Sequence, residues 1–87
     1  MPKPKSDDEI LTEVPWSAGL TDYDQQHFVV YLRLLDASAA GASDAEMSRL
    51  VLGIDPIKEA VRAKAALESH LRRARWMTEQ GYRHLLQ

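Results

Sequence analysis

The sequence predicts an all-α fold, a small three-helix bundle. Apolar residues recur every three or four positions in two long segments, which is the period of a helix buried along one face. Two capping signals, at Thr21 and at Ser43, mark helix starts. No segment alternates apolar and polar residues as a half-buried strand would, and 87 residues suffice for one domain.

Residues 1–19 are predicted to be a flexible N-terminal arm in front of a helical domain at residues 20–87. Proline and charge dominate the first nine residues, and no apolar stretch there resembles a secretory signal peptide. Pro15 interrupts the short apolar cluster that follows and disfavours regular structure. Val14 and Trp16 are the residues through which this arm can fold back on the domain.

The first helix is predicted to begin after Thr21 and to end at Gly41. Thr21 and Asp24 fit a capping box with Asp in the place of Glu. The apolar stripe of this helix comprises Phe28, Tyr31, Leu32, Leu35 and Ala39, and it is widened by Val29, Val30 and Leu34. A stripe this wide indicates a central helix or one whose face is covered by another element.

A short helix and a long helix then predict a helix-turn-helix unit. Residues 43–46 (SDAE) fit the capping box, and Gly53 is typical of a helix end. Asp55 before a proline is typical of an N-cap and the first helical residue. The long helix is predicted over residues 56–79, or from Ala60 if an extended loop precedes it. The residues expected in the core are Met47, Val51, Leu67 and Leu71.

A helix-turn-helix shape favours DNA binding, but the charge of this chain is unevenly placed. Residues 1–55 hold four basic and ten acidic side chains, and residues 56–87 hold seven basic and three acidic ones. The basic side chains of the long helix could contact phosphates or an acidic partner, or could form a solvated helix face. This possible nucleic-acid-like face comprises Lys58, Arg62, Lys64, Arg72, Arg73 and Arg75.

Three pairs of segments resemble a known family in their order and spacing. They are LTDYD at 20–24 with LRLLDA at 32–37, AGAS at 40–43 with LG at 52–53, and LRRAR at 71–75 with GYR at 81–83. Together they resemble the extended-turn helix-turn-helix domain of proteobacterial regulators of conjugative-element transfer. The resemblance covers about residues 20–87 and implies an extended turn before the long helix.

The resemblance implies one of two roles. In FseA-type activators the domain follows a second domain and binds promoter DNA, whereas antiactivators of the QseM type consist of the domain alone. Those antiactivators bind the activator and block transcription of transfer genes. This chain resembles the stand-alone form, which implies a cytoplasmic antiactivator acting on an FseA-type activator, with the LuxR-family quorum-sensing regulator TraR as a further partner.

DNA binding is expected to be weak or absent in this interpretation. DNA-binding members carry arginines on the long helix where this chain has Ala66, Glu68 and Ser69, and Glu68 can pair with Arg72 four residues later. The alternative is a small DNA-binding repressor or excisionase-like factor that places the long helix in the major groove. A helical dimerisation module is the third reading.

The partner-binding surface is predicted on the first helix and the end of the long helix. Large apolar and aromatic side chains dominate protein interfaces. The first helix has a wider apolar stripe than is needed to pack against its two short neighbours. The predicted contact residues are Tyr31, Leu34, Trp76 and Tyr82. The alternative for Trp76 is that it fills the core.

No enzyme, metal site, cofactor or small-molecule substrate is expected. His27, His70 and His84 share no ligand spacing, and the chain has no cysteine. No phosphate-binding glycine loop or nucleophile motif occurs, and no apolar run is long enough to span a membrane.

Overall fold

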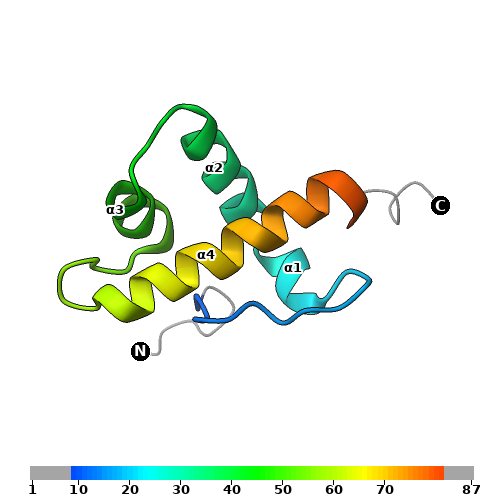
Figure 1. Cartoon of the computed structure of the whole chain (residues 1–87). Coiled ribbons are helices and arrows are strands. Elements are labelled where there is room, and N and C mark those ends of the chain that lie inside the picture. Colours follow the sequence, from blue (N-terminus) through cyan, green and yellow to red (C-terminus); the bar gives the residue numbers. More distant parts are fainter. Residues whose placement is uncertain (1–8, 82–87) are drawn as a thin grey trace, which may run out of the picture.

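The computed structural model describes residues 9–81, which form an arrangement of helices around α4 (Figure 1). The elements are α1 (Asp22–Gln26), α2 (Phe28–Ala39), α3 (Asp44–Met47), η2 (Ser48–Leu52), α4 (Ala60–Trp76) and η3 (Met77–Gly81). The described residues contain no strand, so the predicted all-α class is confirmed. None of the helices in this part of the chain is long and apolar enough to cross a membrane.

The predicted first helix is divided into α1 and α2 at His27. The ring Nδ1 of His27 donates to the Tyr23 carbonyl at 2.8 Å, which is the acceptor that the His27 backbone N–H would use in a continuous helix. That N–H bonds to the Asp24 carbonyl instead, at 3.1 Å. The competing ring contact gives His27 a φ of −122° and breaks the helix there. The predicted cap is present, because Thr21 and Asp24 form a complete capping box.

Glycines end both α2 and η2. Gly41 has a φ of 88°, and the Ala42 N–H returns to the Ala37 carbonyl at 2.9 Å, as in a Schellman motif. Gly53 has a φ of 72° and follows η2. Both positions require the left-handed backbone that glycine adopts at low cost.

The core lies between α4 and the helices α2 and α3. It holds the buried side chains Leu34, Met47, Leu52, Ile54, Ala63, Ala66, Leu67 and Leu71, with Val51 partly buried against them. A second, smaller cluster joins the start of α2 to the end of α4 through Tyr31, Ala74 and Met77. The core residues predicted from the helical period are therefore in the core.

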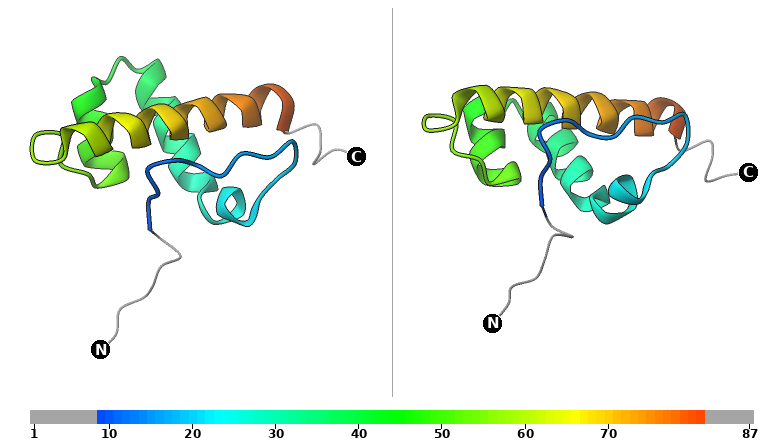
Figure 2. Two further views of the ribbon diagram at one scale, coloured as in Figure 1. Left: turned by 60° about the horizontal axis from the view of Figure 1, so that its bottom comes forward. Right: turned by 90° about the horizontal axis from the view of Figure 1, so that it is seen from below.

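Residues 9–20 have no regular structure and run along α4 (Figure 2). The Ser69 hydroxyl donates to the Thr12 carbonyl at 2.9 Å and accepts from the Val14 N–H at 3.3 Å. Val14 is buried. The expectation that the arm folds back through Val14 is met, and the described part of the predicted flexible arm is held in place by α4. Residues 1–8 lie outside the described residues.

Candidate nucleic-acid interface

The segment α3–η2–α4 has the geometry of a helix-turn-helix with a long turn. Ser43 and Glu46 form both bonds of the capping box that begins α3. Residues 53–59 separate η2 from α4, which is longer than the usual turn of three or four residues. Asp55 accepts from the N–H groups of Ile57 and Lys58 within this turn, so it caps the turn and not α4. The alternative start of the long helix at Ala60 is the correct one.

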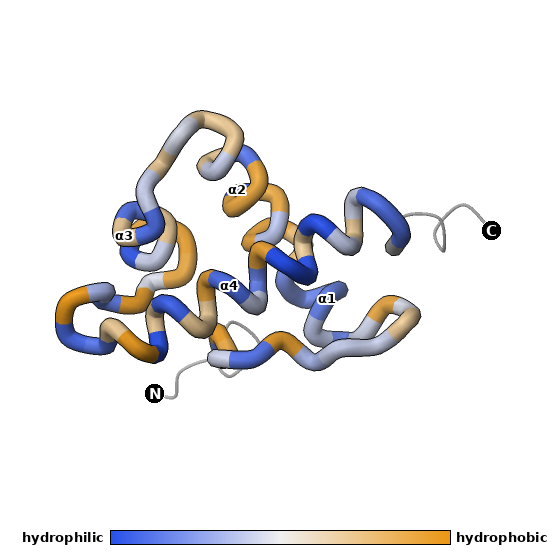
Figure 3. Tube along the Cα trace, viewed as in Figure 1, coloured by the Kyte–Doolittle hydropathy of each residue, from blue (hydrophilic) through white to orange (hydrophobic). Residues whose placement is uncertain are grey.

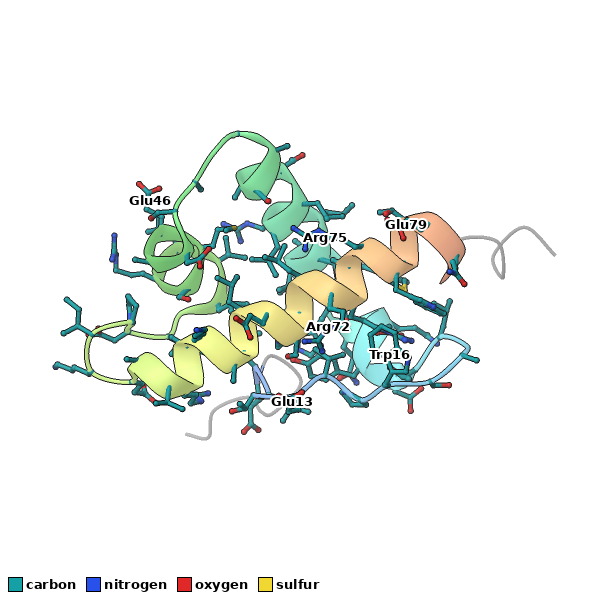
Figure 4. All side chains as sticks on the ribbon, in the orientation of Figure 1. Glu13, Trp16, Glu46, Arg72, Arg75 and Glu79 are labelled. Atoms are coloured by element: carbon teal, nitrogen blue, oxygen red, sulfur yellow. The ribbon has the colours of Figure 1, made fainter. Side chains whose placement is uncertain are left out.

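One side of α4 faces solvent along its whole length, and we call it the outer face. Its residues are Val61, Lys64, Ala65, Glu68, Arg72 and Arg75, followed by Glu79 in η3. On the two flanks lie α3 and the N-terminal arm, as Figure 4 shows for Glu46 on one side and Glu13 on the other. In a helix-turn-helix protein, the second helix is exposed in this way and lies in the major groove of DNA.

Four of the six predicted basic residues are exposed: Lys58, Lys64, Arg72 and Arg75. Arg62 is half-exposed. It pairs with Glu59 at 3.0 Å and donates to the Ile10 carbonyl at 3.2 Å. Lys64 and Glu68 line a hollow against the first residues of α3, including Asp44. The outer face therefore carries charges of both signs.

Arg73 is the exception, and its assignment to an exposed basic face was wrong. Its side chain is 0% exposed. The guanidinium bonds to the carboxylate of Asp24, with the shortest distance 2.6 Å, and donates to the carbonyls of Ser17 and Gly19 at 2.8 Å each. A buried arginine with this set of acceptors holds the arm against α4 and cannot reach a phosphate.

Two tryptophans enclose the same guanidinium. The Arg73 Cζ lies 4.0 Å from the centre of the Trp76 ring and 4.7 Å from that of Trp16, and the two rings are 5.9 Å apart in an edge arrangement. We call Arg73, Asp24, Trp16 and Trp76 the arginine clamp. It gives a reason for a tryptophan in the arm, because Trp16 packs on the Arg73 guanidinium and is itself 54% exposed.

The electrostatics of Asp24 follow from this clamp. Burial alone would raise the pKa of the Asp24 carboxyl, but the hydrogen bonds from Arg73, from the Thr21 N–H and from Tyr31 hold it below its usual value. Burial raises the pKa of the Tyr31 hydroxyl, and its bond to Asp24 adds to that effect. The Asp24 carboxyl therefore stays ionised, as its ion pair with Arg73 requires.

Comparison of the sequence with protein families assigns the chain to a family. The sequence model of the RovC DNA-binding domain family, described as "T6SS, Transcription factor, DNA binding domain", matches residues 9–87. The chain belongs to this family. The match confirms the coarser expectation of a DNA-binding domain of a transcription regulator. Comparison with curated proteins gives no match.

The match to the RovC DNA-binding domain family begins at residue 9 and so includes the arm and the arginine clamp. The clamp is therefore part of the domain that the family defines. Arg73 and Trp16 are distinctive in the sequence, but no local signal joins them. The residue that holds Arg73 is Asp24, whose sequence position indicates only the cap of α1 although its side chain is buried.

The predicted partner-binding residues are mostly internal in this domain of the RovC family. Leu34 is 0% exposed in the main core, and Tyr31 is buried with its hydroxyl on Asp24 at 2.7 Å. Neither can serve as an exposed contact, so these two predictions were wrong about surface position. Trp76 is half-buried in the arginine clamp, and Tyr82 lies outside the described residues.

An apolar groove nevertheless lies where α2 meets the end of α4. We call it the α2 groove. It encloses about 510 Å³ and is lined by Phe28, Tyr31, Leu32, Leu35, Ala74, Met77 and Thr78. Leu32, at its edge, is 62% exposed. Of the predicted partner-binding residues, Tyr31 lines this groove, whereas Leu34 lies in the main core.

A second hollow, of about 540 Å³, lies on α4 beside the clamp. It is lined by Trp16, Glu68, Leu71, Arg72, Arg75, Trp76 and Glu79. Figure 4 shows Trp16, Arg72, Arg75 and Glu79 in this region of α4. Within residues 9–81, no group of three His, Cys, Asp or Glu side chains could hold a metal ion.

Proposed function

We propose that this chain is a DNA-binding domain of a transcription regulator and that it docks the outer face of α4 in the major groove of duplex DNA. The observation that carries the proposal is the exposure of that face between α3 and the arm, in a chain of the RovC DNA-binding domain family. The side chains of the face are free of the core, so they can contact a duplex without rearrangement of the fold.

The charges on this side of the molecule support phosphate contacts of moderate strength. Lys58, Lys64, Arg72 and Arg75 are exposed, whereas the negative charge of Glu59 is paired with Arg62. Glu68 and Glu79 lie on the same face and reduce the attraction. Counterion release by about four phosphate contacts predicts a slope near −3.6 for the logarithm of the association constant against that of the salt concentration.

Fluorescence anisotropy with a labelled random-sequence duplex of 30 base pairs tests this proposal (a duplex of this length covers one domain easily). We expect binding at 50 mM salt that weakens about a hundredfold at 200 mM. The single variants Arg72→Ala and Arg75→Ala should each lower both the affinity and the steepness of the salt dependence. Arg33→Ala is the matched control, because it removes one exposed arginine from α2. An equal loss in Arg33→Ala, or no binding at 50 mM salt, would contradict the proposal.

A second candidate function is that of an antiactivator, which binds a transcriptional activator and blocks transcription of conjugative or integrative element transfer genes. The α2 groove favours it, because the groove is apolar and Leu32 at its edge is exposed. The mixed charge of the outer face fits a domain that has kept a docking surface and has weaker DNA binding. The partner would be an FseA-type activator or a LuxR-family regulator such as TraR.

Co-purification with an FseA-type activator, and separately with TraR, tests this second candidate. Leu32→Lys places a charge at the edge of the α2 groove and should abolish capture by the activator while leaving DNA binding unchanged. Leu50→Lys is the matched control, because Leu50 is an exposed leucine of η2 that does not line the groove. Capture that survives Leu32→Lys would place any partner surface elsewhere.

A further inference from the structure

The two most exposed large apolar side chains of the described residues lie at the beginning of α4. Ile57, in the turn before the helix, is 87% exposed, and Val61, in its first turn, is 85% exposed. Ala60 is also exposed, and Ala65 is half-exposed. In Figure 3 the turn before α4 and the start of α4 carry hydrophobic colour at the outer end of the molecule.

These residues contribute nothing to the core. Val61 has the helical phase of the charged side chains, because it precedes Lys64 by three residues and Glu68 by seven. The buried side of α4 begins instead with Ala63, Ala66 and Leu67. Large aliphatic side chains that remain in water at the accessible end of a helix form a contact surface for something outside the chain.

The surrounding charges favour a polyanion as the occupant. Lys58 and Lys64 are exposed on either side of Val61 in the sequence. Two of the nearby carboxylates are engaged, since Glu59 pairs with Arg62 at 3.0 Å and Asp55 accepts two backbone N–H bonds, whereas Glu68 and Asp44 line a hollow with Lys64. An apolar centre with exposed ammonium groups beside it matches the major groove, where phosphates line both edges and the thymine methyl group is the apolar feature of the floor.

We propose that Val61 reads thymine through its C5 methyl group and that this apolar contact sets the base preference of the domain at that position. The inference rests on the proposed function, because it requires α4 to lie in the major groove. Residues at the N-terminal end of a recognition helix contact base edges. Val61 has no hydrogen-bonding side-chain atom, so a methyl group is the base-edge feature that it can distinguish. Ala65, four residues after Val61, lies on the same side of α4 and is half-exposed.

The test begins with selection of duplexes from a random-sequence library by the full chain. The selected duplex is then synthesised with deoxyuridine in place of each thymine in turn, which removes the methyl group and leaves base pairing intact. We expect one or two positions at which deoxyuridine weakens binding about fourfold, the value for burial of one methyl group. At those positions, Val61→Ala should discriminate between the two duplexes less than the wild type does, because alanine keeps only one methyl group for the contact.

The control is Val29→Ala, which removes an aliphatic side chain of α2 that is 65% exposed and should keep the fourfold discrimination. Circular dichroism of each variant checks that the fold is retained. Equal affinity of the wild type for thymine and deoxyuridine duplexes at every position would overturn the inference and leave the proposed function standing. Failure to select any duplex would overturn both.

Sedimentation of the free protein tests the competing occupant, a second copy of the chain. We expect the wild type and Val61→Ala to have the same sedimentation coefficient over a range of concentrations. A dimer of the wild type that dissociates in Val61→Ala would assign the exposed apolar surface to self-association and would overturn the inference.

Discussion

Replacement of Arg73 by alanine should destabilise the domain more than any other substitution of a charged residue on α4. The change removes every hydrogen bond that the guanidinium makes to Asp24, Ser17 and Gly19, together with its stacking on two tryptophans. It also leaves the Asp24 carboxylate at 0% exposure with only the Thr21 N–H and the Tyr31 hydroxyl as hydrogen-bond donors among the bonds described above.

The expected cost is about 3–5 kcal/mol, the range found when one partner of a buried ion pair is deleted. A domain of 87 residues has a total stability of about 4–13 kcal/mol. The loss is therefore comparable to the whole stability at the lower limit. For a chain of this size it corresponds to a fall in Tm of at least about 12 °C.

Thermal and urea unfolding followed by circular dichroism measure this loss, and fluorescence reports the clamp directly, because Trp16 and Trp76 are the two tryptophans of the chain. Arg72→Ala is the matched control and should change stability by less than about 0.5 kcal/mol, since its side chain is exposed. If Arg73→Ala fails to fold, Asp24→Asn keeps the shape of the site and measures the loss of the carboxylate charge together with one of its two acceptor oxygens. A cost for Arg73→Ala within about 1 kcal/mol of that of Arg72→Ala would refute the reasoning.

Three further predictions concern the caps, the turn and the buried histidine. Ser43→Ala removes one bond of the α3 capping box and should cost about 1 kcal/mol in urea unfolding, whereas an unchanged midpoint would show that α3 is held by packing alone. Gly53→Ala should cost about 1 kcal/mol or more, because φ is 72° although a Cβ would meet no atom within 4 Å. The matched control Gly19→Ala has open space and no positive φ, so equal effects of the two would argue against backbone strain. Burial lowers the pKa of His70, so its contribution to stability is present above about pH 6.5 and decreases as the pH falls below that value. The urea midpoint should therefore fall between pH 7 and pH 5, and His70→Gln should reduce that fall; an equal fall in both proteins would exclude His70 as the cause.

The neutral state of His70 is part of the same connection between the arm and α4. Its Nδ1 donates to the Ala66 carbonyl at 2.6 Å, so the Nε2 atom is left to accept from the Tyr23 hydroxyl, also at 2.6 Å. The Tyr23 oxygen in turn accepts from the Leu11 N–H at 3.1 Å. A proton added to Nε2 removes this acceptor and places a charge in a buried site, which gives the pH dependence its direction.

The elements of the fold could be predicted because their signals are local. The capping boxes at Thr21 and Ser43 and the stop at Gly53 depend on residues that are three or four positions apart, and all are present as expected. The break at His27 could not be predicted, since it arises from a side chain that competes for a carbonyl of its own helix.

The site could be predicted only in part, because exposure is a tertiary property. Arg72, Arg73 and Arg75 are equivalent as sequence letters, yet Arg73 is buried and the other two are in solvent. Arg73 differs from the other two because it pairs with Asp24, which is 49 residues away in the sequence, and because the N-terminal arm covers it. The exposure of Val61 could not be predicted from its residue type, because an apolar residue in a helix is usually expected in the core. Its helical phase nevertheless agrees with the charged residues of the outer face.

The burial of Arg73 affects how this domain can recognise DNA. Without Arg73, the outer face of α4 has Lys64, Arg72 and Arg75 set against Glu68 and Glu79, so non-specific attraction to phosphates is only moderate. Phosphate contacts position a domain without specifying the sequence, so selectivity has to come from contacts with base edges, and moderate phosphate affinity lets the domain dissociate readily from wrong sites. The exposed aliphatic side chains before Lys64 are suited to such contacts, and they are located where a recognition helix penetrates deepest. Mixed charge on this face is therefore consistent with a specific DNA reader that binds random sequence weakly.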